Sequence, residues 1–447
     1  MFKKILIANR GDVALRVLRA CKALGIPTVI VHSTADAQSM PVKLADESVC
    51  IGGPAAADSY LNIPAILTAA TITGCDAVHP GVGFLAENAY FAEIIAAHGM
   101  TFIGPSAQHI QKMGDKVEAK ITAAEAGLPL VPGSPGAVPT LEEAAELAKG
   151  VGFPLLVKAA SGGGGRGMKV AKTADDLAEA YASARSEAKA AFGDDTVYLE
   201  RYLDNPRHIE VQVIADSHGN VVHLGERECS VQRRHQKLFE EAPSPALSQQ
   251  ERAEIGRIAA EATAKMGYLG VGTMEFLWQD GQFFFIEMNT RLQVEHPITE
   301  AITGIDLVRE QILIAAGGQL PFTQKDIEFD GHAIECRINA EHPETFMPTP
   351  GKVASFHAAG GPGVRVDTVL YTGYQIPPFY DSLIAKLVVH GADREQALAR
   401  LRGALDEFVV EPIPTTLALH RRLLDAPAIQ DGSYTIRWLE ETFLNQD

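Results

Sequence analysis

Apolar and polar positions follow two periods in the first hundred residues. Short apolar runs predict strands at residues 5–8, 28–32, 76–79 and 101–103. Between these runs, apolar side chains recur at helical spacing over residues 13–24 and 63–72. Strands that alternate with helices are typical of parallel βαβ units, so the N-terminal region is predicted to be a Rossmann-like α/β layer.

A second unit begins after a stretch rich in Pro and Gly at residues 128–139. Its pattern predicts strands at 155–159, 168–171 and 197–202, with a helix over 175–190. The chain between the first two of these strands is rich in glycine. This unit is therefore predicted to be a small α/β lobe that carries a glycine loop.

From about residue 203, apolar and polar positions alternate singly, as is typical of antiparallel strands with one buried face. Strands are predicted at residues 208–215, 221–226, 272–278 and 282–288, and helices over 248–266, 305–316 and 394–408. Asp280-Gly281 predicts a hairpin turn between the last two strands. The chain is thus predicted to combine α/β and α+β architecture.

The net negative charge of the chain bears on which kinds of molecule it binds. Lys and Arg number 39 among the 447 residues, Asp and Glu number 56, and the formal net charge is −17. Nucleic acid is not expected as a partner, because neutralising its phosphates requires clustered basic residues. A small anionic ligand remains compatible, since a basic pocket can lie in an acidic protein.

The number of cysteines and the length of the apolar segments indicate the cellular compartment. The 5 cysteines are an odd number without a CxxC pair, which predicts a reducing compartment and neither a disulfide framework nor a zinc site. No apolar run reaches the ~18 residues of a membrane span, and the run at residues 5–8 is too short for a signal peptide. We expect a cytoplasmic protein with no membrane partner.

The glycine loop after Lys158 is the first candidate for chemistry. Its four consecutive glycines have no side chains to cover the backbone N–H groups, and they tolerate positive φ. The backbone can therefore approach phosphate oxygens closely. The loop lies between two strands and is not followed by GKS or GKT, so it is neither a Walker loop nor a dinucleotide fingerprint. A flexible linker is the alternative, but Lys158 and Arg166 flank the loop between apolar strands.

A pair of carboxylates is expected on the predicted hairpin. Glu275 and Glu287 each lie six residues from Gly281, so they fall within one residue of opposite positions. Whether they share a face depends on loop length or a bulge, since a slip of one residue reverses the face. With Asn289, these acids suit Mg²⁺ shared with ATP phosphates. Solvated strand carboxylates are the alternative, which the apolar run at 283–286 disfavours.

Polar side chains occupy every second position from Glu287 to Glu295. If this run is extended, Glu287, Asn289, Arg291, Gln293 and Glu295 all point to one side. Arg291 offers a planar fork for a small planar anion, and Glu295 beside it is a candidate general base. A solvated edge strand is the alternative, although so specialised a polar face is unusual for a surface.

Two further segments carry candidate ligands. His208, Glu210 and Gln212 share one face of a predicted strand, which favours a place in the nucleotide site over a structural histidine. Residues 229–237 hold three basic side chains beside His235, which predicts a local positive pocket for phosphate and bicarbonate. A surface patch is the alternative for this second segment.

Jointly, these motifs resemble those of biotin carboxylase, the ATP-grasp subunit of bacterial acetyl-CoA carboxylase and related biotin-dependent carboxylases. The resemblance covers essentially the whole chain, and its most specific motifs lie at residues 113–116, 158–168, 200–203, 232–237 and 289–297. It implies an ATP-grasp fold with an N-terminal pre-ATP-grasp domain at 1–114, an ATP-grasp region at 115–330 with a mobile lid at about 131–203, and a C-terminal mixed domain at 331–447.

The resemblance implies a role for each motif residue. ATP contacts are expected from Lys116, Lys158, Gly164, Gly165, Glu200, Arg201, Tyr202, Leu203, His208, Gln232 and His235. Ligands of Mg²⁺ or Mn²⁺ are expected to be Glu275, Glu287 and Asn289. Bicarbonate is expected to bind Lys237, Arg291, Gln293, Val294 and Glu295. Glu295 would deprotonate bicarbonate to allow formation of carboxyphosphate, and Arg337 would stabilise the biotin enolate.

The resemblance also implies partners: a biotin carboxyl carrier protein, carboxyltransferase subunits and a second copy of the chain. Met168-Lys169-Val170 resembles the carrier's Met-Lys-Met, but it follows the glycine loop on a strand, so biotin is expected on another polypeptide. The chain departs from the family where Val82 replaces a common aromatic near the biotin pocket. Ala86 replaces a common serine, and Ala23 replaces an acid at the family's dimer interface.

Two other functions remain open from the sequence. One is another ATP-grasp ligase that activates a different carboxylate as an acyl phosphate, which Val82 favours. The other is a non-catalytic nucleotide-binding regulator, which predicts a broken site. The sequence argues against a regulator, because it retains the expected catalytic residues Lys237, Arg291, Glu295 and Arg337.

Overall fold

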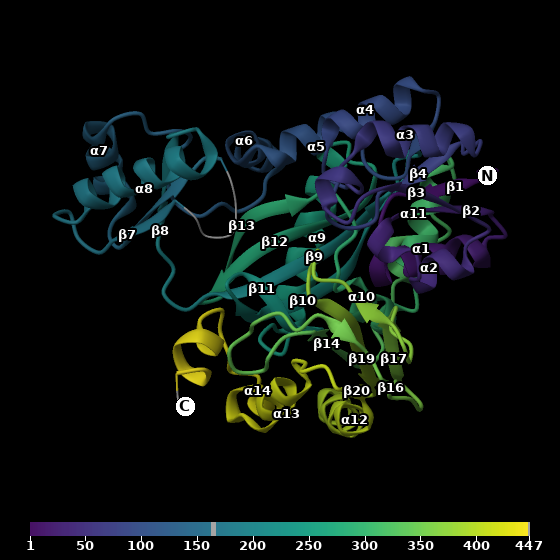
Figure 1. Ribbon diagram of the computed structural model, residues 1–447. Helices are drawn as coiled ribbons and strands as arrows, with labels where there is room; N and C mark the ends of the chain where they lie inside the picture. Colours follow the sequence, from purple (N-terminus) through teal and green to yellow (C-terminus); the bar gives the residue numbers. More distant parts are fainter. Residues whose placement is uncertain (162–166, 446–447) are drawn as a thin grey trace.

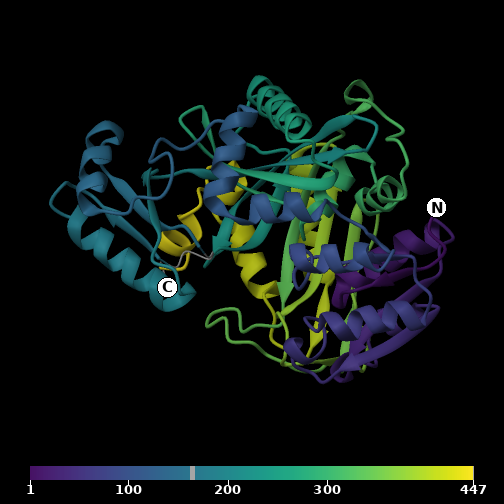
Figure 2. The same ribbon diagram turned by 90° about the horizontal axis from the view of Figure 1, so that it is seen from above.

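Three bodies make up the molecule: an N-terminal α/β layer, a projecting lid lobe and a body built on one large sheet (Figure 1). The computed structural model describes residues 1–161 and 167–445, so the predicted ATP-binding residues Gly164 and Gly165 lie outside the described residues. Figure 2, a view from above, shows the lid lobe standing off to one side of the other two bodies.

The N-terminal layer is a five-stranded parallel sheet in the order β3-β2-β1-β4-β5. Its strands are β1 (Ile5–Ile7), β2 (Thr28–Ser33), β3 (Glu47–Gly52), β4 (Ala77–His79) and β5 (Thr101–Phe102). Its helices are α1 (Gly11–Ala23), α2 (Met40–Leu44), α3 (Ile63–Ile72) and α4 (Ala89–Ala97). The predicted α/β layer is confirmed. The pattern did not indicate β3, because this edge strand is largely exposed and has no apolar run.

The lid lobe holds a three-stranded antiparallel sheet in the order β7-β6-β8. Its elements are α7 (Leu141–Val151), β6 (Leu155–Ala159), β7 (Met168–Ala171), α8 (Leu177–Phe192) and β8 (Val197–Arg201). α5 (Ala107–Gly114) and α6 (Lys116–Ala126) lead from the N-terminal layer toward this lobe. The small core of the lobe is separate from the main cores.

An eight-stranded antiparallel sheet, in the order β13-β12-β9-β10-β11-β14-β19-β17, forms the body. Its strands are β9 (Arg207–Ala215), β10 (Val221–Arg233), β11 (Gln236–Ala242), β12 (Gly270–Gln279), β13 (Gln282–Asn289), β14 (His332–Asn339), β17 (Val364–Thr368) and β19 (Leu383–Gly391). Pairing of β11 with β14 makes the sheet continuous across residue 330. Side chains from both parts of the chain can therefore meet on one face.

Helices cover both faces of this sheet. They are α9 (Gln249–Lys265), α10 (His296–Thr303), α11 (Leu307–Ala315), α12 (Arg394–Glu407), α13 (Leu417–Asp425) and α14 (Pro427–Asp431), followed by a π-helical turn, η4 (Trp438–Phe443). Short strands complete the C-terminal part: β15 (Gly351–Lys352), β16 (Ser355–His357), β18 (Gln375–Ile376) and β20 (Val409–Glu411). Short 3₁₀ turns are η1 (Thr34–Asp36), η2 (Ala56–Asp58) and η3 (Gln324–Asp326). Within the described ranges, no helix is long and apolar enough to cross a membrane.

Candidate functional site

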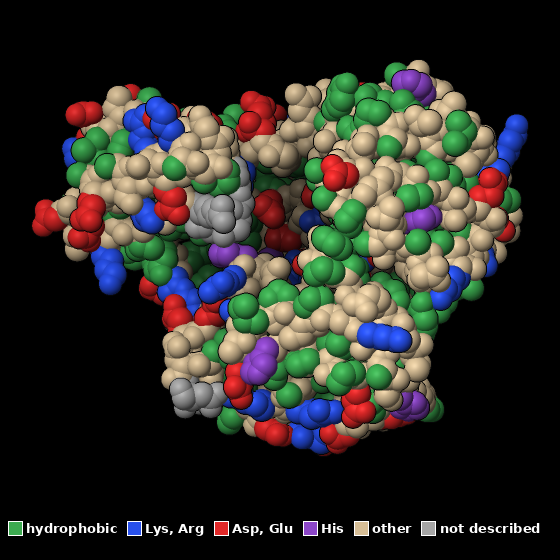
Figure 3. All heavy atoms as spheres, in the orientation of Figure 1, with side chains coloured by type: hydrophobic (Ala, Val, Ile, Leu, Met, Phe, Trp, Pro, Cys, Tyr) green, Lys and Arg blue, Asp and Glu red, His purple; other side chains and the backbone are tan. Residues whose placement is uncertain are grey.

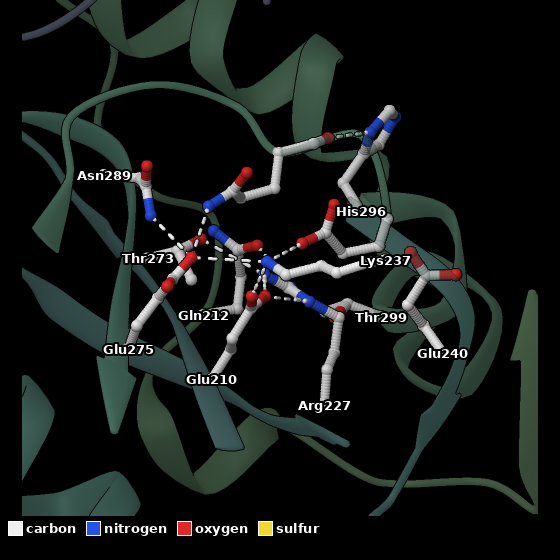
Figure 4. Close-up of polar contacts among 12 residues, drawn as sticks. Glu210, Gln212, Arg227, Lys237, Glu240, Thr273, Glu275, Asn289, His296 and Thr299 are labelled. Atoms are coloured by element: carbon white, nitrogen blue, oxygen red, sulfur yellow. Dashed lines mark hydrogen bonds and ion pairs between the residues drawn. The ribbon is translucent and has the colours of Figure 1, made fainter. Parts of the chain in front are cut away.

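The side chains expected to bind the metal and bicarbonate gather at one face of the eight-stranded sheet. Figure 3 shows a hollow between the lid lobe and the rest of the molecule, with acidic and basic side chains inside it. In the close-up of Figure 4, polar groups converge on Lys237 from β9, β12 and the turn that follows β13.

Lys237, on β11, binds three carboxylates from three other segments. Its ammonium contacts Glu210 and lies 2.7 Å from Glu295 Oε1 and 3.2 Å from Glu275 Oε1. Burial opposes the charge of Lys237, but the carboxylates outweigh it and hold its pKa well above the usual value. Burial and the neighbouring Glu295 raise the pKa of Glu210 to about 7. The site is therefore a cluster of mutually dependent charges.

The predicted positive pocket at residues 229–237 is wrong. Arg234 and His235 form the exposed turn of the β10–β11 hairpin, with φ of 48° and 64°. Arg233 is half-buried just before this turn. Only Lys237 reaches the site, where acids surround it. The Arg233 guanidinium lies over the ring of Phe346, 3.7 Å from its centroid, and Arg234 is exposed, so the basic side chains of this segment do not form one pocket.

Glu295 lies in the turn that begins α10. β13 ends at Asn289, so the prediction of an extended run to Glu295 is wrong beyond that residue. The turn brings Glu295 Oε1 to Lys237 and places Oε2 2.9 Å from Arg337 Nη2. Burial opposes ionisation, but the charges of Lys237, Arg337 and Arg227 hold the pKa of Glu295 well below its usual value.

Arg291 is held in a different network at the same edge. Its Nε lies 2.8 Å from Glu87 Oε2, and its Nη1 donates to Gln293 Oε1 at 2.8 Å. Its Nη2 donates to Asn289 Oδ1 at 3.1 Å. The carbonyl oxygen of Val294 accepts from Lys386 at 3.0 Å. The five residues predicted to bind bicarbonate thus lie together, although a turn and not a strand aligns them.

The predicted metal ligands lie on the β12–β13 hairpin. Asp280 and Gly281 form its two-residue turn, and a bulge after Glu275 places that residue directly opposite Glu287. Without this irregularity the partner of Glu275 would be one residue away, with its side chain on the other face. The bulge therefore brings both acids to one face, beside Asn289.

The donor set fits a hard divalent cation. Burial and the charge of Glu275 raise the pKa of Glu287, and within the described part of the chain the Glu287 carboxylate accepts no hydrogen bond. A cation beside the two acids would remove this repulsion. Glu275 also accepts from Asn289 Nδ2 at 2.8 Å and Gln293 Nε2 at 3.2 Å, so the metal and bicarbonate residues are directly linked.

His208 and Gln232 join the nucleotide side to the charged cluster. His208 Nε2 lies 2.9 Å from Glu275 Oε2, and its Nδ1 contacts the amide of Gln232. Burial lowers the pKa of His208, but Glu275 outweighs burial and raises it above the usual value. The expected shared face of His208, Glu210 and Gln212 is confirmed, since all three side chains enter the cluster.

The remaining expected ATP residues lie at the start of α6, on the lid lobe and just after β8. Lys158 Nζ on β6 lies 2.9 Å from Glu200 Oε2 on β8. Burial and the charge of Lys158 lower the pKa of Lys116 at the start of α6. Just after β8, the ring of Tyr202 lies under the guanidinium of Arg437, and the carbonyl of Leu203 accepts from that group at 3.1 Å. Arg201 is exposed at the end of β8.

Sequence reasoning missed several charged residues of the site. They are Glu87, Lys120, Arg227 and Glu240. Lys120 binds Glu200, one turn of helix after Lys116, so spacing on α6 was an available signal. Glu87 and Glu240 gave no such signal, because each meets its arginine across a long sequence separation.

Arg227 is a buried hydrogen-bond donor to the residues of this cluster, and its loss should destabilise the fold. It is 0% exposed and donates to Glu210, Gln212, Thr273 and Thr299. Substitution by methionine would leave Glu210 without this partner, at a cost of about 3–5 kcal/mol in the free energy of unfolding. Urea denaturation measures this loss.

The control for this substitution lies on α9, where Arg257 forms an exposed ion pair with Glu261. Arg257→Met should cost no more than about 0.5 kcal/mol, since an exposed helical pair contributes little. Equal effects of Arg227→Met and Arg257→Met would contradict the supporting role of Arg227.

Three family models match the chain in order. They are the biotin carboxylase N-terminal domain over residues 1–110, the ATP-binding domain of the carbamoyl-phosphate synthase L chain over 115–323, and the biotin carboxylase C-terminal domain over 335–441. Two similar relatives are the biotin carboxylases of Pseudomonas aeruginosa, 56% identical, and Haemophilus influenzae, 55% identical. Each alignment covers 99% of this chain, with 98% of the first relative and 99% of the second.

Solved structures give the same result. A biotin carboxylase complex from Campylobacter jejuni is 49% identical, with a TM-score of 0.94 over 98% of both chains. The biotin carboxylase domain dimer of the Hydrogenobacter thermophilus 2-oxoglutarate carboxylase, in complex with MgADP, ADP and bicarbonate, is 47% identical with a TM-score of 0.94. That alignment covers 100% of this chain and 99% of the other. The predicted ATP-grasp architecture is confirmed, and the chain belongs to the biotin carboxylase family.

Proposed function

We propose that the chain carboxylates biotin, with bicarbonate as the carboxyl source and ATP as the energy source, at the cluster of Lys237, Glu295 and Arg337. The observation that carries this proposal is the Glu295 carboxylate, which is 1% exposed and held between an ammonium and a guanidinium. The two cations can bind a small anion, and the carboxylate between them can accept its proton.

Bicarbonate itself would activate the base. Glu295 bound by two cations is a weak base, because its pKa lies well below the usual value. A bicarbonate anion beside Lys237 and Arg291 competes with Glu295 for Lys237 and weakens the contact between that ammonium and the carboxylate. The pKa of Glu295 then rises toward the range in which a carboxylate accepts a proton effectively. Proton transfer is thereby restricted to the loaded site.

ATP would lie between the lid and the sheet, with its phosphates near Lys116 and Lys158. Glu275, Glu287 and Asn289 would hold Mg²⁺ or Mn²⁺, which would supply positive charge to offset that of the phosphates. When bicarbonate gives its proton to Glu295, the freed oxygen attacks the γ-phosphorus and the bond to ADP breaks. The products of this step are carboxyphosphate and ADP.

Carboxyphosphate would break into CO₂ and phosphate, and the phosphate would take the N1 proton of biotin. N1 then attacks CO₂ and becomes carboxylated. Negative charge develops on the ureido oxygen of biotin during this step, and the guanidinium of Arg337 is placed to stabilise it. Lid closure would exclude water from the reactive intermediate.

The expected partners belong to the same proposal. Biotin would arrive on a biotin carboxyl carrier protein, and carboxyltransferase subunits would complete the enzyme. A homodimer is supported by the dimeric biotin carboxylase domain from Hydrogenobacter thermophilus. The cysteines, all free in this structure, support the expected cytoplasmic location. The proposed domains are the N-terminal domain at residues 1–114, the ATP-grasp region at 115–330, with the lid at about 131–203, and the C-terminal domain at 331–447.

ADP release tests this function against the ligase alternative. The chain should release ADP only when bicarbonate is present, and free biotin should accelerate the release. Turnover that requires another carboxylate and ignores both bicarbonate and biotin would replace this proposal with the acyl-phosphate ligase. Glu254→Gln, at an exposed position of α9, is the control for handling and purification.

A further inference from the structure

Two buried glutamates lie behind Arg337 and are not used in the reaction proposed above. Glu240 on β11 and Glu335 on β14 are cross-strand partners, so their side chains stand next to each other on one sheet face. Both are 0% exposed. Arg337 lies two residues after Glu335, on the same face. In Figure 4, Glu240 lies to one side of the Lys237 cluster.

The hydrogen bonds of this pair are incomplete. Glu240 Oε1 accepts from Arg337 Nε at 2.6 Å, while Glu240 Oε2 and both carboxyl oxygens of Glu335 have no partner. An isolated buried carboxylate without donors is very costly, whereas a protonated carboxyl group can donate one hydrogen bond. A single proton between the two side chains would supply partners for two of these three oxygens.

The charged surroundings agree with one shared proton. Burial raises the pKa of Glu335 most. The charges of Lys386 on β19 and Arg337 on β14 lower it, while those of Glu240 and of Glu295, at the start of α10, raise it. The Lys386 ammonium already donates to Val294 and lies 3.3 Å from an Asp12 oxygen. Neither carboxyl oxygen of Glu335 has a hydrogen-bond partner, so the Lys386 ammonium does not donate to Glu335.

Other groups around the pair do not supply the missing donors. His296, from α10, points its Nδ1 to Gln293, and burial followed by the charge of Lys386 holds the pKa of His296 well below its usual value. Lys237, on the same strand as Glu240, binds its own three carboxylates. Burial is the largest influence on the pKa of both Glu240 and Glu335 and raises each of them.

We propose that Glu240 and Glu335 share one proton and together position Arg337. The pair then carries one negative charge, which binds Arg337 Nε and leaves Nη2 directed toward Glu295. Without the proton, two adjacent negative charges would lie in the sheet. With a second proton, Arg337 Nε would lose its ionised partner. The pair is a positioning element and transfers no proton during the cycle. Only the consequence for biotin rests on the proposed function.

Infrared spectroscopy of the full chain detects the proton directly. A buried protonated carboxyl group has a C=O stretch that is separate from that of a carboxylate and shifts in D₂O. The difference spectrum between wild type and Glu335→Gln at neutral pH should contain one such band. Absence of the band would overturn the proposal. Because this measurement needs no substrate, its outcome is independent of whether the chain carboxylates biotin.

Glu241→Gln is the matched control for the infrared measurement. Glu241 is the next residue on β11, is equally buried, and accepts hydrogen bonds from His332, Arg394 and Tyr434. Burial opposes its ionisation, but its donors hold the pKa of Glu241 to about 2. Its substitution should therefore remove no protonated-carboxyl band. A band lost in both variants would contradict the assignment to Glu335.

Glu335→Met keeps the test decisive if one variant fails to fold. Methionine is an apolar side chain of similar volume, so it should replace a neutral acid without leaving an unpaired charge. Folded Glu335→Met that lacks the band supports the proposal. If both Glu335→Gln and Glu335→Met fail to fold, an ionised Glu335 is required and the proposal is overturned.

Glu240→Gln tests the positioning of Arg337. Loss of the ionised acceptor of Arg337 Nε should lower biotin-dependent turnover by roughly 10–100-fold, as expected for a hydrogen bond to a charged group. Bicarbonate-dependent ADP release without biotin should fall less. Equal losses in the two assays would indicate general disruption of the site and contradict a role that acts through Arg337.

Discussion

Substitution of Glu295 by glutamine should lower bicarbonate-dependent turnover by roughly 10²–10⁴-fold, the usual contribution of a general base. The amide keeps the shape of the side chain but cannot accept the proton of bicarbonate. It also leaves Lys237 and Arg337 without the carboxylate that lies 2.7 Å and 2.9 Å from them. ATP binding should persist, since Lys116 and Lys158 belong to another part of the site.

Steady-state ADP release and equilibrium nucleotide binding are the two measurements for this variant. Glu254→Gln makes the same chemical change at an exposed position of α9 and should behave as wild type. Activity of Glu295→Gln within tenfold of wild type would remove Glu295 from the role of base. Loss of nucleotide binding would show that the substitution had disturbed more than proton transfer.

Removal of the Arg337 side chain should separate the two halves of the reaction. Arg337→Ala should lower biotin carboxylation by roughly 10²–10³-fold, the usual effect of deleting one group that stabilises a developing oxyanion. Bicarbonate-dependent ADP release in the absence of biotin should be affected less, because Lys237 and Arg291 remain for the anion. The two rates are measured on the same preparation.

Arg291→Ala is the contrasting variant. Arg291 binds Gln293 and Asn289 at the bicarbonate end of the cluster, so its loss should reduce ADP release and biotin carboxylation together. Equal losses in Arg337→Ala would contradict the separate roles. A selective loss of biotin carboxylation in Arg291→Ala would show that the two arginines had been assigned to the wrong substrates.

Hydrophobic periodicity was sufficient to predict most of the fold. It located the parallel layer, the lid lobe and the β12–β13 hairpin, because each has a buried face of regular period. It did not find the full β10–β11 hairpin. The segment from Glu226 to Ala242 carries many buried charged side chains, so its apolar signal is weak, and its Arg234-His235 turn contains no glycine.

The sequence predicted which residues belong to the candidate site better than it predicted how they are arranged. Specific residue types at short spacing identified Glu275, Arg291 and Glu295. The bulge that brings Glu275 opposite Glu287 depends on pairing between strands, and local spacing leaves that pairing open. Likewise, the carboxylates around Lys237 come from strands far apart in sequence, which made the cluster acidic where a positive pocket was expected.

Transfer of label from bicarbonate to biotin tests the central claim most directly. With ATP, radiolabelled bicarbonate and free biotin, the chain should form labelled carboxybiotin in proportion to the ADP released in excess of the rate without biotin. Glu295→Gln should abolish both this label and the bicarbonate-dependent ADP. ADP release by the wild-type chain in the presence of biotin without labelled carboxybiotin would contradict the assignment of the Lys237, Glu295 and Arg337 cluster to biotin carboxylation.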